Sequence, residues 1–246
     1  MTRTKKTTPA RYGMIIPAVN CAAEPHAARY TPPGASVHTT RLRMTGEYAM
    51  TLDRLLPRVA EAAAMLADAG CNPVVFHCTA NSMADGVAGE KRIGAAIEAA
   101  TGGRATTTAA AAMAAFRALG AKRAVLVSPY RRSTHEHEID FLTEAGLEIV
   151  GDRNLDLATA DDYYAVTPDD WVEIVASVKN DRADAYFVSC ANIRATEAIE
   201  RMEERLDRPV LTSNQVVIWR ALRLAGIEGP IPGLGRLTRI AAAAAT

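Results

Sequence analysis

Two short segments of this 246-residue chain are similar to each other, and each leads to a cysteine. Residues 74–81 read VVFHCTAN and residues 186–192 read YFVSCAN, so an apolar run ends at a thiol and is followed by small residues that can open a helix. The field of a helix N-terminus favours the thiolate of a cysteine placed there. We expect Cys78 and Cys190 to face each other across a cleft, where two thiols can perform nucleophilic and acid–base chemistry without a metal or cofactor.

Other landmarks repeat with the cysteines. An apolar run leads to Asn20 in the first half and to Tyr130 in the second, and a Thr- or Ser-containing start precedes the last helical run of each half, at residues 106–108 and 212–214. These landmarks recur in the same order roughly 110 positions apart, which predicts two homologous lobes of small-domain size. The predicted first lobe covers residues 1–119 and the second covers residues 120–215, with residues 216–246 packing back on the first.

Short β-branched runs alternate with alanine-rich helical stretches, the pattern of a parallel sheet covered by helices on both faces. The predicted strands are residues 14–17, 36–42, 74–77, 105–108, 124–128, 147–152, 185–189 and 210–212. The predicted helices are residues 51–69, 109–119, 168–180 and 216–224, while residues 237–245 are either a helix or a frayed tail. The predicted fold class is α/β, with two pseudosymmetric α/β/α lobes, each with a mostly parallel sheet, and the active site in the cleft between them.

The composition limits the partners. Lys and Arg total 28, as do Asp and Glu, so no net charge favours nucleic acid. No apolar run approaches the roughly 18 residues that span a bilayer, and no signal-peptide core follows the basic N-terminus. We therefore expect a cytoplasmic protein that binds neither nucleic acid nor membrane. Its four cysteines are expected to be free thiols, because no pair has the Cys-x-x-Cys spacing of a zinc or redox site.

Several other residues are expected to do no chemistry. Cys21 and Cys71 have no partner in the repeat. His77 precedes Cys78, but neighbouring side chains of a strand point to opposite faces, so His77 is expected in the core or behind the site. The His-Glu-His-Glu run at residues 135–138 lacks the spacing of a metal site and is predicted to be a solvated helix start, so no metal is expected.

In open parallel sheets ligands bind beyond the carboxyl ends of the strands, and every landmark of the repeat lies at such an end. Backbone N–H groups after the two cysteines can bind an anion there. Asn20 and Tyr130 can add side-chain hydrogen bonds, although Asn20 can equally be a helix cap and Tyr130 a packing residue. The expected ligand is a small carboxylate, and the candidate binding residues are Asn20, Thr79, Ala80, Tyr130, Ala191 and Asn192.

Four motifs, taken in order, resemble those of the maleate cis-trans isomerases in the aspartate/glutamate racemase superfamily. They are IIPAVN at residues 15–20 with Glu-Pro at 24–25, the strand that ends in Cys-Thr at 78–79, Ser-Pro-Tyr at 128–130, and the strand that ends in Cys190. The resemblance covers nearly the whole chain. It implies two pseudosymmetric α/β lobes with the active site between them, no cofactor, and a homo-oligomer, either a dimer or a tetramer.

The resemblance also implies a mechanism. In a maleate isomerase, a Cys78 thiolate would add to the double bond of a cis-enedioate and Cys190 would protonate the neighbouring carbon, so that the new single bond can rotate before elimination. The superfamily also contains amino-acid and hydantoin racemases, which use two cysteines for proton transfer, and arylmalonate decarboxylases, which keep only the second. We therefore expect a cofactor-independent isomerase, with a two-cysteine racemase, a decarboxylase or a non-catalytic carboxylate-binding protein as alternatives.

One position departs from the maleate isomerase pattern. Such isomerases carry a substrate-binding Asn in the loop after the second strand of the second lobe, where Asp162 is aligned. A carboxylate close to a dianionic substrate costs electrostatic energy unless it is protonated or paired. Asp162 is therefore a candidate binding residue. Either the substrate carries an amide, hydroxyl or ammonium group at that end, or a different residue of the loop occupies the position of the Asn.

Overall fold

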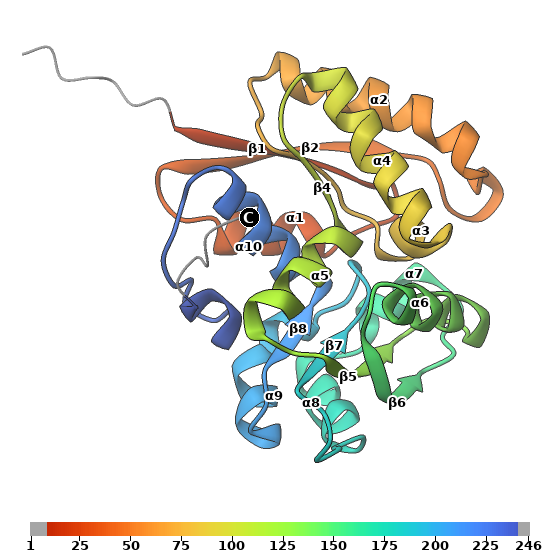
Figure 1. Ribbon diagram of the computed structural model, residues 1–246, viewed down its shortest axis with the longest axis vertical. Coiled ribbons are helices and arrows are strands. Elements are labelled where there is room, and N and C mark those ends of the chain that lie inside the picture. The colour runs from red at the N-terminus through yellow and green to blue at the C-terminus, as the bar shows by residue number, and fades with distance from the viewer. Residues whose placement is uncertain (1–8, 241–246) are drawn as a thin grey trace, which may run out of the picture.

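The computed structural model describes residues 9–240, and within them eight strands form two separate parallel sheets of four strands each (Figure 1). The first sheet has the order β2-β1-β3-β4 and the second has the order β6-β5-β7-β8. The strands of the first sheet are β1 (Ala10–Pro17), β2 (Ala35–Leu42), β3 (Val74–Phe76) and β4 (Ala105–Thr107). Those of the second are β5 (Arg123–Ser128), β6 (Glu148–Asn154), β7 (Ala185–Val188) and β8 (Val210–Thr212). All six strand pairs are parallel and the two orders are equivalent, so the predicted fold class is confirmed.

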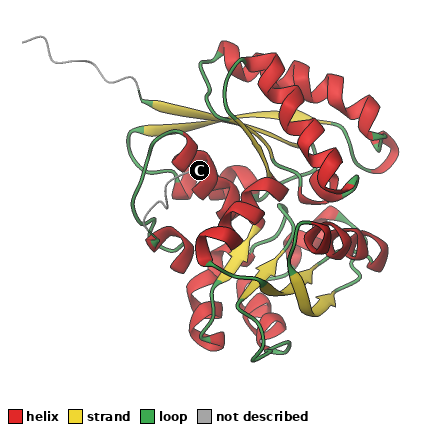
Figure 2. Ribbon diagram, in the orientation of Figure 1, coloured by secondary structure: helices red, strands yellow, loops and turns green. Residues whose placement is uncertain are grey.

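Helices surround both sheets (Figure 2). Those of the first half are α1 (Ala23–Tyr30), α2 (Leu52–Asp68), α3 (Thr79–Met83), α4 (Gly86–Thr101) and α5 (Thr108–Leu119). Those of the second are α6 (Arg132–Glu144), α7 (Ala160–Ala165), α8 (Pro168–Ala176), α9 (Ile199–Leu206) and α10 (Ser213–Leu224). Short 3-10 helices occupy Gly46–Tyr48, Ala195–Ala198 and Arg236–Arg239. None of the helices between residues 9 and 240 is long and apolar enough to cross a membrane.

The eight predicted strands all form. The inner strands β3 and β7 are fully buried apolar runs, whereas β2 and β6 lie at the sheet edges and are only partly buried. The predicted helix 168–180 begins at Pro168 as expected but ends at Ala176. Asn180 lies outside it and donates a hydrogen bond through Nδ2 to the carbonyl of Val150 on β6, at 2.7 Å. Of the predicted segment 237–245, the part up to residue 239 lies in a 3-10 helix, and residues 241–246 lie outside the described residues.

Two cores hold the elements in place. The first extends from the space between the sheets, where α5 and α10 pack against each other, through the second sheet to α8 and α9 (Figure 1). Within it, Phe116 of α5 meets Phe187 of β7 edge to face at 6.1 Å. The second lies between the first sheet and the pair α2 and α4, and it contains Phe76 and Val59. The lobe boundaries at residues 119 and 215 remain a prediction.

Candidate active site

A cavity of about 100 Å³ lies where the carboxyl ends of the two sheets meet. Its walls come from the turns that follow β1, β2, β3, β5 and β7, together with α7. The lining residues are Pro17, Val19, Asn20, Thr45, Cys78, Thr79, Ala80, Asn81, Tyr130, Ala160, Tyr163, Cys190, Ala191 and Asn192. The structure therefore brings together every candidate residue from the sequence except Asp162.

Cys78 follows β3 and occupies the N-cap position of α3, a helix of five residues. Its side chain is buried, and its thiol donates a hydrogen bond to Oδ1 of Asn81 at 3.2 Å. Burial raises the pKa of the Cys78 thiol to about 12, against the lowering effect of the backbone N–H of Asn81. Desolvation of the thiolate is the largest cause of this shift.

Cys190 follows β7 and has a backbone φ of 119°, in the left-handed region that side chains other than glycine rarely adopt. Its N–H donates to Oγ of Ser213 at 3.0 Å, and its Sγ accepts from the N–H of Asn192 at 3.3 Å. Burial raises the pKa of the Cys190 thiol to about 12, although the hydroxyl of Tyr130 and the N–H of Asn192 both lower it.

The expectation of helix-end thiols with a favoured thiolate was therefore wrong in two respects. Cys190 is followed by a turn and the 3-10 helix Ala195–Ala198, so no α-helix begins there. The pKa is raised at both Cys78 and Cys190, because the surrounding protein excludes water from the sulfur atoms.

Ser213, the first residue of α10, ties the two cysteine turns together. Its Oγ accepts hydrogen bonds from the N–H of Cys190 and, at 2.9 Å, from the hydroxyl of Thr79. Residues 212–214 were predicted as a helix start within the repeat, but Ser213 was not among the predicted site residues. Its position beyond a strand end, in a segment that repeats, was the available signal.

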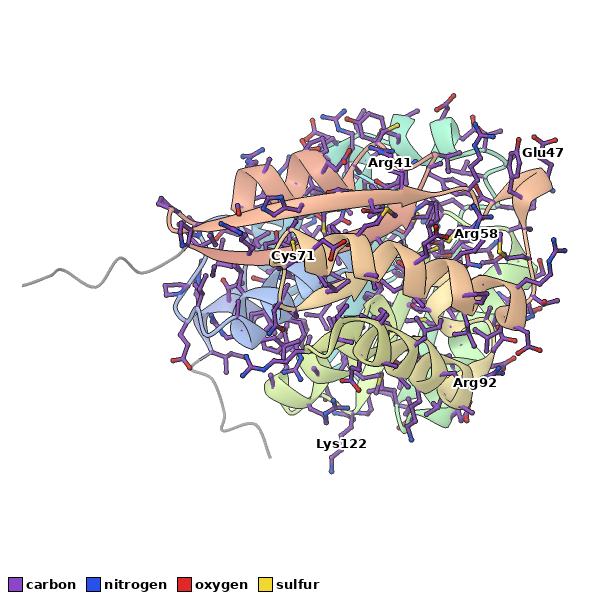
Figure 3. The ribbon with its side chains drawn as sticks, turned by 90° about the horizontal axis from the view of Figure 1, so that it is seen from above. Arg41, Glu47, Arg58, Cys71, Arg92 and Lys122 are labelled. Atoms are coloured by element: carbon purple, nitrogen blue, oxygen red, sulfur yellow. The ribbon has the colours of Figure 1, made fainter. Side chains whose placement is uncertain are left out.

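Asn20 caps a turn and lines the cavity at the same time. Its Oδ1 accepts from the N–H groups of Ala22 and Ala23, at 3.0 and 2.8 Å, which leaves the Nδ2 amide as a donor for a ligand. Arg41 of β2, labelled in Figure 3, fixes the same turn. It donates to the carbonyl oxygens of Ala18 and Asn20, at 3.0 and 2.8 Å. Asn20 therefore stabilises the turn that leads into α1, and its role in binding a substrate remains a prediction.

Asn192 uses its side chain to join two loops. Its Oδ1 accepts from the N–H of Cys21 at 2.7 Å, and its Nδ2 donates to the carbonyl of Ala160 at 2.9 Å. The side chain of Asn192 thereby holds together the turn after β1 and the start of α7. Both loops contribute to the cavity wall.

Two tyrosines form another wall. The rings of Tyr130 and Tyr163 meet edge to face, with centroids 5.6 Å apart and an interplanar angle of 87°. Burial raises the pKa of Tyr130 well above its ordinary value, so its hydroxyl stays protonated as a donor. Tyr163 was not predicted as a site residue, although the sequence placed its neighbour Asp162 there.

The side chain of Asp162 caps a helix. Its carboxylate accepts from the N–H of Thr159 at 2.9 Å, and the hydroxyl of Thr159 accepts from the N–H of Asp162 at 3.1 Å, which makes a capping box at the start of α7. These hydrogen bonds lower the pKa of the exposed carboxyl. Ala160 and Tyr163, three positions apart on one helix face, line the cavity, and Asp162 does not.

His77, Cys71 and Cys21 were predicted from the sequence to do no chemistry. His77 is buried and its ring nitrogens bond Thr108 at 2.9 Å and Asn214 at 2.6 Å, as expected of a residue behind the site. Cys71 is buried near the end of α2 (Figure 3), and Cys21 is exposed.

The prediction of a solvated helix start at residues 135–138 was wrong for two of its four side chains. His135 and Glu138 are both fully buried. They lie three positions apart on the inward face of α6, so helical periodicity carries them into the interior together. His135 bonds Ser128 through Nδ1 at 2.7 Å, and Glu138 accepts from Ser189 at 2.8 Å.

Comparison with known proteins identifies relatives of this chain. The model of the arylmalonate decarboxylase family matches residues 12–238. A maleate isomerase of Geobacillus stearothermophilus is 26% identical over 242 residues, which cover 92% of this chain and 96% of the relative. An arylmalonate decarboxylase of Bordetella bronchiseptica is 30% identical over 188 residues, which cover 75% of this chain and 78% of the relative.

Solved structures agree with the sequence relatives. The maleate isomerase of Pseudomonas putida S16 with maleate superimposes with a TM-score of 0.84 at 25% identity, covering 94% of this chain and 98% of that one. A crystal structure of arylmalonate decarboxylase superimposes with a TM-score of 0.83 at 28% identity, covering 93% and 98%. The resemblance predicted from the motifs is confirmed, and the chain belongs to the family of arylmalonate decarboxylases and maleate isomerases in the aspartate/glutamate racemase superfamily.

Proposed function

We propose that this chain is a cofactor-independent cis-trans isomerase of a small unsaturated dicarboxylate, of the maleate-to-fumarate type. The observation that carries the proposal is that Cys78 and Cys190, from equivalent strands of the two sheets, line one small cavity. Two curated relatives, from Geobacillus stearothermophilus and Nocardia farcinica, support it, because both are maleate isomerases and both match more than nine-tenths of this chain.

In the proposed reaction the two thiols have different roles, which follow the family resemblance. A Cys78 thiolate forms a bond to one carbon of the double bond, and the π electron pair moves to the neighbouring carbon, which takes the proton of the Cys190 thiol. The carbon–carbon bond is then single and rotates. The Cys190 thiolate removes a proton from the same carbon, the electron pair re-forms the double bond, and the Cys78 sulfur leaves as a thiolate. Substrate and product are isomers, so the cycle consumes no cofactor.

Forming a thiolate in the cavity costs free energy, which the surrounding residues must reduce. A thiol with a pKa of about 12 lies about five units above neutral pH, so its ionisation at pH 7 costs about 7 kcal/mol. This cost already includes the hydrogen bonds to the charged sulfur, without which the pKa of each thiol would be higher still. The available donors are the N–H of Asn81 toward Cys78, and the Tyr130 hydroxyl and Asn192 N–H toward Cys190.

A proton NMR time course with maleate in D2O under reducing conditions tests the proposal. We expect fumarate to appear with the unmodified enzyme and to be lost in both Cys78→Ala and Cys190→Ala. Cys71→Ala is the matched control, because Cys71 is also a buried thiol but lies outside the cavity. Maleate that remains unchanged with the folded, reduced enzyme would contradict the proposal.

An arylmalonate decarboxylase is the second candidate. The relative from Bordetella bronchiseptica favours it, and Pro17, Val19 and Tyr163 give the cavity an apolar wall that an aryl group can contact. The same NMR assay with phenylmalonate separates the two, because loss of carbon dioxide with no effect of Cys78→Ala would favour the decarboxylase. Exchange of the α-proton of an amino acid or hydantoin for deuterium would instead favour a two-cysteine racemase.

A further inference from the structure

We infer that Glu138 controls the ionisation of the two cavity thiols, because one negative charge is shared among Glu138, Cys78 and Cys190, and an ionised Glu138 suppresses the thiolates. In turnover this role rests on the proposed function, since it concerns the thiolates that the isomerase reaction uses. The effect of Glu138 on the ionisation of the thiols does not require a bound substrate. Glu138 is a positioning residue, because it lies outside the lining of the cavity.

The geometry places this carboxyl behind both cysteine turns. Glu138 is fully buried on α6, and its Oε1 accepts from the hydroxyl of Ser189, the residue directly before Cys190, at 2.8 Å. The helix α6 also packs against α3, which begins directly after Cys78. Oε2 of Glu138 is buried without a hydrogen-bond partner. An ionised carboxylate with an unpartnered buried oxygen is costly, which favours the neutral acid.

The charges of the cluster oppose one another. Burial raises the pKa of Glu138 to about 8, while the Ser189 hydroxyl lowers it. The negative charge of Glu138 in turn raises the pKa of Cys78, Cys190 and Tyr130. When a cavity thiol loses a proton while the ionised Glu138 takes one up, an S–H bond breaks, a carboxyl O–H bond forms, and the total charge of the cluster is unchanged.

Other ionisable groups around α6 are not among the causes of the Glu138 shift, which are burial and Ser189 alone. On α6 itself these groups are Arg132, His135, Glu136, His137, Asp140 and Glu144. On the elements packed against it they are Asp85, Glu90, Lys91, Arg92 and Glu98 at α4 and its N-cap, and Glu148, Asp152 and Arg153 on β6. The helix α3 carries no charged side chain.

This arrangement predicts a break in the pH dependence of thiol reactivity. Below pH 8 the carboxyl is neutral, and the thiolate population rises tenfold per pH unit in the wild type and in Glu138→Gln alike. Above about pH 8 the wild-type cluster already holds its negative charge, so the thiolate population rises less steeply. Glu138→Gln has no competing carboxylate and keeps the full slope. The variant should exceed the wild type about fivefold or more at pH 9.

The test is the rate of iodoacetamide alkylation of each cysteine between pH 6 and pH 10, followed by peptide mass spectrometry without substrate. We expect equal rates at pH 7 and faster alkylation of Cys78 and Cys190 in Glu138→Gln at pH 9, with exposed Cys21 unchanged as the internal reference. Ser189→Ala is the second variant, because loss of the donor raises the pKa of Glu138 and should move the break to higher pH. Circular dichroism checks that each variant is folded.

Two results would overturn the inference. One is a break near pH 8 that persists in Glu138→Gln, and the other is a Ser189→Ala profile that coincides with the wild type. If Glu138→Gln does not fold, the Ser189→Ala profile decides. Because no substrate is present, a failure of the isomerase assay leaves this result intact, and a failure here leaves the isomerase assay intact.

Discussion

Replacing Tyr130 with Phe removes one oxygen atom from the cavity and leaves the ring that packs edge to face on Tyr163. The lost hydroxyl is the side-chain donor that lowers the pKa of Cys190. A hydrogen bond to a charged group contributes about 1.5 to 3 kcal/mol, which corresponds to a rise of about one to two units in the pKa of that thiol. We therefore expect the alkylation rate of Cys190 at pH 8, and turnover of maleate with it, to fall about ten- to one-hundredfold.

Alkylation of Cys190 by iodoacetamide, quantified by peptide mass spectrometry, measures the effect directly, and the NMR assay measures turnover. Tyr12→Phe is the matched control. Tyr12 is also buried, but its hydroxyl bonds Thr31 at 2.7 Å, away from the cavity lining. We expect that control to lower the free energy of unfolding by about 1 kcal/mol and to leave Cys190 unchanged. Unchanged alkylation in Tyr130→Phe, or an equal loss in the control, would refute the reasoning.

Three further perturbations separate the roles assigned to side chains around the site. Ser213→Ala removes the acceptor that holds the strained backbone of Cys190. The free energy of unfolding in urea should therefore fall by about 1 to 3 kcal/mol, and turnover should fall with it. Full activity would contradict that role. Asp162→Ala should lower the melting temperature and leave the KM for maleate unchanged, because the carboxylate caps α7; a raised KM would return Asp162 to the site. Asp184 has its pKa lowered to about 2, mainly by Arg123, so its stabilisation is present above the unfolded pKa of about 4 and is lost as the pH falls toward 2. Urea unfolding of Asp184→Asn should therefore show a deficit against the wild type at pH 6 that disappears near pH 2, and a deficit independent of pH would contradict this assignment.

The strands and the cysteine pair could be predicted because their signals are local. A strand buried on both faces is a short apolar run, as at Val74–Phe76 and Ala185–Val188, and the ligand site of a parallel sheet lies where such runs end. The internal repeat then indicated that Cys78 and Cys190 occupy equivalent positions. These features need no knowledge of how side chains pack.

The remaining features depend on packing that a linear pattern does not carry. In the short helix α7, Ala160 and Tyr163 line the cavity, whereas Asp162 bonds back to the helix N-terminus. The cap at Thr159 fixes where the helix begins and therefore which of its side chains reach the cavity. The direction of the thiol pKa shifts depends on how much water the folded chain excludes from the sulfur atoms, which the sequence does not show. The burial of Glu138 likewise depends on the packing of α6 against α3, which the sequence does not show.

The most direct test of the proposed mechanism is detection of its covalent intermediate. Cys190→Ala lacks the thiol that we propose as acid and base, so it should complete the cycle poorly and accumulate substrate on the other cysteine. We would incubate this variant with maleate, quench it with acid, and locate any adduct by peptide mass spectrometry. The account predicts the mass of one maleic acid added to Cys78. An adduct on a different residue, or none on Cys78 while the unmodified enzyme makes fumarate, would contradict it.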